Sequence, residues 1–124
     1  MIIGIDFDGT IVKHEFPKIG DIIPDAIEVI RELVDSKHKI ILWTMRSGET
    51  LNDAIEFLRK LDIPLFGINE NPSQHKWTNS PKAYCQKYID DAALGCPLIF
   101  PDDGGRPWVD WIKVRGLLKA DKFL

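Results

Sequence analysis

The chain has 124 residues, of which 44% are apolar and 28% are charged, and its formal net charge is −3 at pH 7. This composition suits one domain with a hydrophobic core and is not that of a disordered chain. The mildly acidic balance argues against the broad basic surface of a protein that coats nucleic acid or an anionic membrane.

The cysteines and the apolar runs both indicate a cytoplasmic protein. Cys85 and Cys96 form neither a CxxC pair nor a cluster with zinc spacing, so we expect two reduced thiols. No segment reads as a signal peptide, and no apolar run approaches the roughly 20 residues that span a bilayer. We therefore expect a cytoplasmic protein with no membrane partner.

The first quarter of the chain predicts a strand, a loop and a helix. Residues 2–5 are apolar and mostly β-branched, which favours a buried strand that ends in a turn at residues 6–10. Residues 11–23 are mixed and read as a loop or small hairpin. Pro24 suits a first helical position, and apolar residues then recur at helical spacing to Val34.

The middle of the chain repeats this order. Residues 40–43 predict a second buried strand, which ends at Thr44. An amphipathic pattern over residues 51–61 predicts a second helix, and residues 64–68 predict a third short strand. Residues 69–81 are polar and rich in turn formers, so we expect a loop there.

The last third adds two expected strands and a helix. Residues 84–89 predict a strand that ends in Asp90 and Asp91, and residues 98–100 predict a short one. Pro107 is expected to open a final helix. The order β-α-β-α-β-loop-β-β-α predicts a single α/β domain over residues 1–124, with three layers and a mostly parallel central sheet covered on both faces.

Polar residues follow several of the expected strands. Asp6 and Asp8 follow the first, Thr44 follows the second, and Asp90 and Asp91 follow the fourth. Ligands of parallel sheets gather beyond the carboxyl ends of the strands, so we expect these residues at one edge. Clustered carboxylates raise each other's pKa unless a cation neutralises them, and Mg²⁺ prefers oxygen ligands. Asp6 and Asp90 are the leading metal ligands; Asp91 binds directly or holds a coordinating water, and Asp8 offers its backbone carbonyl.

The same residues suit phosphoryl transfer. The Asp6 carboxylate can attack phosphorus, and Asp8 can protonate the leaving oxygen and then deprotonate the attacking water. Thr44 offers a hydroxyl to a nonbridging oxygen, and Lys82 would balance the negative charge. Contacts to the substrate are expected from four further residues: Gly9, Thr10, Met45 and Arg46.

This set of motifs resembles the haloacid dehalogenase (HAD) superfamily over about residues 1–100. Residues 6–10, DFDGT, match its DxDGT signature, and Thr44 matches its second motif. Lys82 fits the third motif, with Lys76 and Lys87 as competitors, and the pair at residues 90–91 matches the acidic fourth motif. The resemblance implies a Rossmann-like core, Mg²⁺ and an aspartyl-phosphate intermediate on Asp6, hence a phosphatase.

Many HAD proteins carry a cap domain, whereas this chain resembles the capless members. The two sites where a cap could be inserted, residues 11–23 and 69–81, are too short for a separate fold. An open site would admit a small phosphorylated molecule or a phosphate on nucleic acid or protein. Otherwise a second copy in a homo-oligomer, or a cover formed by Arg106, Trp108 and Trp111, would have to exclude water.

Two other functions share this chemistry. A signalling receiver module also gathers acids, Mg²⁺, a hydroxyl and a lysine, but usually with its acidic pair on the first strand and its phosphoacceptor on a middle one. An inactive binding protein on the same core is the other alternative. The order of the motifs favours the Mg²⁺-dependent phosphomonoester hydrolase, with its substrate left open.

Overall fold

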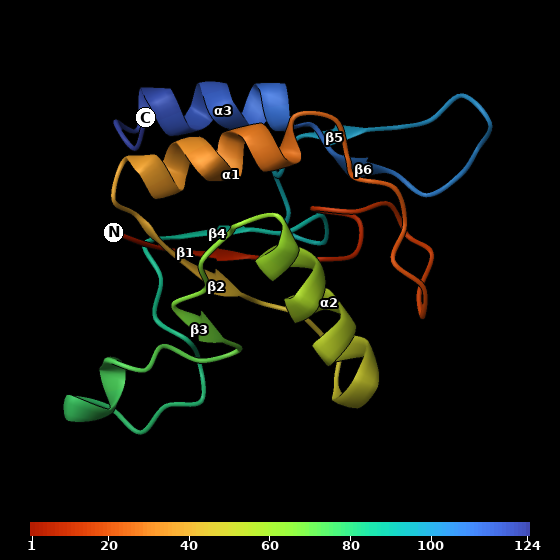
Figure 1. Cartoon of the computed structure of the whole chain (residues 1–124). Coiled ribbons are helices and arrows are strands. Elements are labelled where there is room, and N and C mark those ends of the chain that lie inside the picture. The colour runs from red at the N-terminus through yellow and green to blue at the C-terminus, as the bar shows by residue number, and fades with distance from the viewer.

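The computed structural model describes residues 1–124, and a sheet of four parallel strands lies at its centre (Figure 1). The sheet has the strand order β3-β2-β1-β4. A separate antiparallel pair, β5 and β6, forms a hairpin beside it. The strands are β1 (Ile2–Ile5), β2 (Lys39–Leu42), β3 (Gly67–Ile68), β4 (Lys87–Ile89), β5 (Leu98–Ile99) and β6 (Trp108–Val109).

Three helices flank the sheet: α1 (Ala26–Asp35), α2 (Gly48–Lys60) and α3 (Trp111–Ala120). Each is amphipathic, and α1 buries Ile27, Ile30 and Leu33, which recur at helical spacing. Helices α1 and α3 lie side by side (Figure 1). No helix combines the length and the apolar character needed to cross a membrane.

The two faces of the sheet are covered differently. Alternation along β1 sends Ile3 and Ile5 to one face, where they share a single buried cluster with apolar residues of all three helices. Gly4 points to the opposite face, where the connection between β3 and β4 covers the sheet. A Cβ on Gly4 would lie 3.1 Å from the sulfur of Cys85, so glycine at this position lets that connection pack closely.

The strand order determines which chain segments meet at the carboxyl edge. Strand β1 lies between β2 and β4, and its ladder continues beyond its last residue, because the N–H of Asp6 donates to the carbonyl of Ile89 over 2.9 Å. The N–H of Trp43 donates in the same way to the carbonyl of Ile5. The segments that follow β1, β2 and β4 therefore lie side by side.

The structure confirms the predicted α/β class: a small Rossmann-like fold with a parallel central sheet and no cap. Residues 11–23 form turns and isolated bridges, and residues 69–81 contain only a 3₁₀ turn, η1 (Gln74–Lys76). Helix α1 begins at Ala26 rather than at Pro24.

The prediction of a helix from Pro107 is wrong. Residues 108–109 form β6, in which Trp108 pairs with Ile99, and the helix begins only at Trp111. The carboxylate of Asp110 accepts a hydrogen bond from the N–H of Lys113 and caps the helix. Because this pairing depends on β5, which lies nine to eleven positions earlier in the chain, the local proline signal does not reveal it.

Candidate functional site

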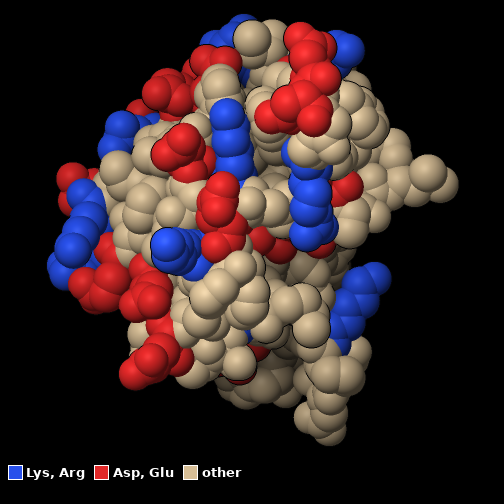
Figure 2. Space-filling view, turned by 90° about the vertical axis from the view of Figure 1, so that its right-hand side faces the viewer, with Lys and Arg blue, Asp and Glu red and all other residues tan.

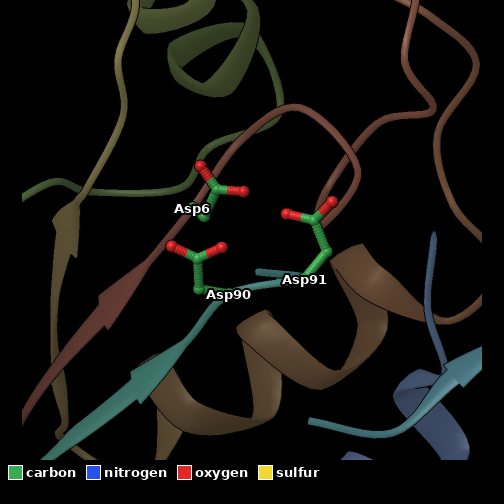
Figure 3. A group of neighbouring side chains, drawn as sticks. All are labelled: Asp6, Asp90 and Asp91. Atoms are coloured by element: carbon green, nitrogen blue, oxygen red, sulfur yellow. The ribbon is translucent and has the colours of Figure 1, made fainter. Parts of the chain in front are cut away.

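Three carboxylates meet at the carboxyl edge of the sheet. Asp6 follows β1, and Asp90 and Asp91 follow β4. One oxygen from each lies within 4.8 Å of the others, and the side chains converge on one point in Figure 3. All three residues are half-buried. The expectation that the first and fourth strands bring their acids together is therefore met by the geometry.

The buried hydroxyl of Thr10 connects the two acidic segments. Its Oγ1 donates to Oδ2 of Asp6 over 2.9 Å and accepts from the N–H of Asp91 over 3.1 Å. Thr10 is 0% exposed, so it cannot reach a substrate from this position. The contact role expected for Thr10 is thus corrected to a positioning role that holds Asp6 beside Asp91.

Two members of the acidic cluster, Asp6 and Asp90, have a raised pKa. Burial, the neighbouring Asp91 and the charge of Asp90 raise the pKa of Asp6 to about 8, and burial raises that of Asp90 as well. A divalent cation among these oxygens would remove the repulsion, and a set of three carboxylates is the hard oxygen donor set that Mg²⁺ prefers. The residues present therefore fit the expected ion.

His14 and Gly9 complete the wall beside Asp91. The Nε2 of His14 lies 2.9 Å from Oδ2 of Asp91. Gly9 has φ +84°, and a Cβ there would collide with the His14 ring and the Asp91 carboxylate. The N–H of Gly9 donates to the carbonyl of Val12, so this amide is not free for a phosphate oxygen. Gly9 shapes the turn instead of contacting substrate, which corrects its expected role.

Asp8 turns away from the three-carboxylate cluster toward Arg46. The Nε and Nη2 atoms of Arg46 each donate to one oxygen of Asp8 over 2.8 Å. The Asp8 side chain keeps 18% of its surface exposed and lines the same hollow as Asp6. Its carboxylate is therefore available to a bound substrate without belonging to the cluster of metal ligands.

Arg46 is a structural clamp, which corrects its expected role in substrate binding. Besides its two bonds to Asp8, its guanidinium donates to the carbonyls of Pro17, Lys18 and Thr50. These five bonds use all its N–H donors. With 3% of its surface exposed, Arg46 has no donor left for a substrate phosphate or carboxylate.

Thr44 and Met45 lie at the end of β2, on the other side of Asp6. The N–H of Thr44 donates to Oδ1 of Asn69 over 2.7 Å, and its hydroxyl accepts from the N–H of Arg46. Met45 is 97% exposed at the rim of the hollow, where a substrate group can reach it. Both residues line the hollow, and the roles expected of them from the sequence stay predictions.

These side chains line a hollow of about 470 Å³ that opens to solvent. Its wall is formed by the four acids together with seven other residues: His14, Phe16, Thr44, Met45, Arg46, Ala92 and Arg106. Figure 2 shows the side of the molecule toward which the strands point, and acidic and basic side chains are interspersed over it.

Lys82 does not join this hollow. Its ammonium group lies 5.6 Å from the ring centre of Tyr88, and the residue precedes β4, whereas the acids follow it. Of the two competing lysines, Lys87 pairs with Asp121, and Lys76 lies in the exposed turn η1. None of the three lines the acidic hollow, so the geometry does not support the expected lysine.

Sequence reasoning missed Asn69, and it did not pair His14 with Asp91. Asn69 follows β3, so the rule that placed Thr44 at the end of a strand would also have placed Asn69 at this edge. His14 meets Asp91 across 77 positions of sequence, and no local pattern signals that contact.

The β5–β6 hairpin is attached to the turn that follows β1. The N–H of Val109 donates to the carbonyl of Gly9 over 3.0 Å, and Nε1 of Trp111 donates to the carbonyl of Thr10 over 2.6 Å. Trp111 is 1% exposed and belongs to the core, whereas Arg106 lines the hollow. Of the cover expected from the sequence, only Arg106 reaches the site.

No family model and no curated protein matches the chain. A solved structure of a conserved protein from Bacteroides thetaiotaomicron is 37% identical to it, with a TM-score of 0.79. The match covers 98% of this chain and 91% of that one.

Proposed function

We propose that this chain, which belongs to the same family as the conserved Bacteroides thetaiotaomicron protein, is a Mg²⁺-dependent phosphomonoester hydrolase. The reaction would pass through an aspartyl-phosphate on Asp6, as the resemblance to the HAD superfamily implies. The observation that carries the proposal is the convergence of Asp6, Asp90 and Asp91 within 4.8 Å, beside Asp8 and Thr44 in one open hollow.

In the proposed reaction Asp6 acts as the nucleophile. Thr10 holds one of its oxygens, and the ladder bond from its N–H to Ile89 fixes its backbone. In the first step a carboxylate oxygen of Asp6 forms a bond to phosphorus while the bond from phosphorus to the ester oxygen breaks. The hydroxyl of Thr44 can donate to a nonbridging oxygen of the phosphoryl group.

In the proposed reaction Asp8 moves the protons. As the ester bond breaks, a protonated Asp8 would give its proton to the leaving oxygen, which departs as an alcohol. In the second step Asp8 takes a proton from a water that attacks phosphorus, and the bond to Asp6 breaks. Each Asp8 oxygen can accept a second partner while Arg46 holds it, so the clamp leaves room for this exchange.

Asp6, Asp90 and Asp91 are the residues that would hold Mg²⁺. When bound, the ion supplies positive charge that keeps Asp6 ionised and offsets the charge of the phosphoryl group. His14 and Thr10 orient Asp91 and Asp6 toward it through hydrogen bonds.

The test is phosphate release from p-nitrophenyl phosphate and from a panel of esters, with Mg²⁺ and with EDTA. The panel includes sugar phosphates, nucleotides, phosphopeptides and oligonucleotides phosphorylated at either end, because an open hollow admits small and large esters alike. We expect Mg²⁺-dependent turnover by the wild type and none by Asp6→Asn, whose similar side chain should preserve the fold.

Three results would contradict the proposal in different ways. Retained turnover by Asp6→Asn would reject Asp6 as the nucleophile. A long-lived phosphorylated Asp6 without turnover would favour the receiver alternative. Binding of phosphate esters without either reaction would favour an inactive binding protein.

A further inference from the structure

The hollow carries an excess of negative charge, because Arg46 is paired with Asp8 and Lys82 lies outside the hollow. The wall carries the carboxylates of Asp6, Asp8, Asp90 and Asp91, and Arg46 offsets only the charge of Asp8. A divalent ion among the other three still leaves negative charge before a substrate phosphate enters. Phosphoryl-transfer sites place fixed positive charge against the transferring group, so a further cation is needed.

Arg106 is the cation that the structure leaves free for this task. It lines the hollow with the four carboxylates, is exposed, and forms no ion pair or hydrogen bond with the rest of the protein. Its guanidinium therefore keeps all its donors, in contrast to that of Arg46. A free guanidinium can bind two phosphate oxygens at once.

The hairpin that carries Arg106 is anchored a few residues away, although the Arg106 side chain is free. Three residues later, Val109 donates its N–H to Gly9, within the turn that carries Asp8. Before the tip of the hairpin, Leu98 pairs with Val109 and Ile99 with Trp108. The hairpin is thus joined directly to the loop of the proposed nucleophile, which keeps Arg106 at the rim of the site.

We propose that Arg106 binds the phosphoryl group of the substrate and supplies the positive charge that the sequence led us to expect from Lys82. This proposal rests on the proposed function, because it assigns a phosphate to the hollow beside Asp6. It makes the β5–β6 hairpin, residues 98–109, a part of the substrate site.

The experiment compares Arg106→Ala and Arg106→Lys with Asp102→Ala, a matched control that removes an exposed charge from the same hairpin without touching the hollow. Calorimetry measures the Kd of inorganic phosphate at saturating Mg²⁺, and the Kd of Mg²⁺ alone. Steady-state kinetics with p-nitrophenyl phosphate gives kcat and KM, and thermal melts confirm that the variants fold.

We expect Arg106→Ala to weaken phosphate binding and to lower kcat/KM by about 10- to 100-fold each, the loss expected for a charge-assisted contact. Mg²⁺ binding should stay within about twofold, because Arg106 is not among its ligands. Arg106→Lys should restore part of the phosphate affinity and of kcat/KM, because the lysine ammonium keeps the positive charge but cannot bind two phosphate oxygens as the planar guanidinium does. Asp102→Ala should behave as the wild type.

The outcomes separate this proposal from the proposed function. An active wild type with unchanged phosphate binding and kcat/KM in Arg106→Ala would overturn the role of Arg106 alone. A wild type without turnover whose phosphate binding still depends on Arg106 would support the anion site and reject the hydrolase. A wild type that shows neither turnover nor phosphate binding would overturn both.

Discussion

Arg46 grips Asp8 with two parallel hydrogen bonds of 2.8 Å, although the two residues are 38 positions apart. Only 1% of the Arg46 side chain is exposed, whereas Asp8 keeps 18% open to the hollow. A single guanidinium thus joins the loop after β1 to the loop after β2. The proposed acid–base group therefore has one orientation before substrate arrives.

Replacement of Arg46 should cost stability as well as activity. Arg46→Ala removes the buried partner of Asp8 and leaves three backbone carbonyls without their donor. We expect a loss of about 3 kcal/mol or more in the free energy of unfolding, which lowers Tm by roughly 10 °C. Thermal and urea denaturation measure it.

The matched control for that variant is Arg59→Ala, which breaks the exposed pair with Glu56 on α2. It should leave the melting temperature unchanged. Arg46→Lys should fold better than Arg46→Ala yet keep a reduced kcat, because an ammonium cannot reproduce the fork. Equal melting temperatures for Arg46→Ala and wild type would contradict the clamp.

The raised pKa of Asp6 links pH, stability and metal binding. In the folded, ion-free protein this pKa is about 8, above its ordinary value of 3.8. The folded state therefore holds a proton that the unfolded chain releases, so the group favours folding most below pH 3.8, and this contribution falls as pH rises toward 8. Added Mg²⁺ should reverse the loss, because the ion takes the place of the proton.

Calorimetry of Mg²⁺ binding in two buffers of different ionisation enthalpy checks this linkage. Below pH 8 we expect proton release on binding and a Kd that falls as pH rises from 6 to 8. Asp6→Asn should abolish most of that release. A Kd that is independent of pH over this interval would show that Asp6 carries no proton in the ion-free site.

The hydroxyl of Thr10 should matter to both stability and metal affinity. Thr10→Val keeps the shape of a fully buried side chain but removes the donor to Asp6 and leaves the N–H of Asp91 without its acceptor. We expect a loss of about 1–3 kcal/mol in stability and weaker Mg²⁺ binding. Thr10→Ser, which keeps the hydroxyl, should retain most of the Mg²⁺ affinity. Equal Mg²⁺ affinities for Thr10→Val and wild type would contradict the role of the Thr10 hydroxyl in holding Asp6 beside Asp91.

Asn69 should support turnover through Thr44. Its Oδ1 is the acceptor for the Thr44 N–H, so Asn69→Ala frees the segment that presents the hydroxyl. We expect kcat/KM to fall by about three- to tenfold, the cost of one neutral hydrogen bond. Asn79→Ala, an exposed change in the same connection, is the control and should leave kcat/KM unaltered.

The carboxyl edge was predictable from sequence because strands and their following residues are local patterns. The apolar residues before Asp6 and those before Thr44 predicted two strands. Parallel pairing of these strands brings their carboxyl ends to the same edge of the sheet. The hydrogen-bond partners of Thr10 and Arg46 were not predictable from the sequence. Each partner lies in a distant segment and is brought close only by the packing of the folded chain. A DxDGT motif indicates the chemistry but not which neighbour holds each side chain.

For Lys82 and Trp108 the sequence pattern led to a wrong prediction, because the folded chain puts each residue in a different environment from the one the pattern indicated. Trp108 follows a proline and precedes apolar residues at helical spacing, but pairing with Ile99 makes it a strand. Lys82 has the expected order along the chain, yet it lies on the ring of Tyr88 rather than in the acidic hollow. The position of a residue in the order of motifs does not determine whether its side chain reaches the site.

The hydrogen bond from Trp111 to Thr10 joins positions 101 residues apart. Like the contact of Thr10 with Asp91, this bond joins an early segment of the chain to a late one. It can therefore form only after the late segment has been synthesised. A nascent polypeptide that has not yet released Trp111 from the ribosome lacks this bond, so the carbonyl of Thr10 has no indole donor. This contact between the first loop and the last helix therefore forms only after Trp111 has left the ribosome.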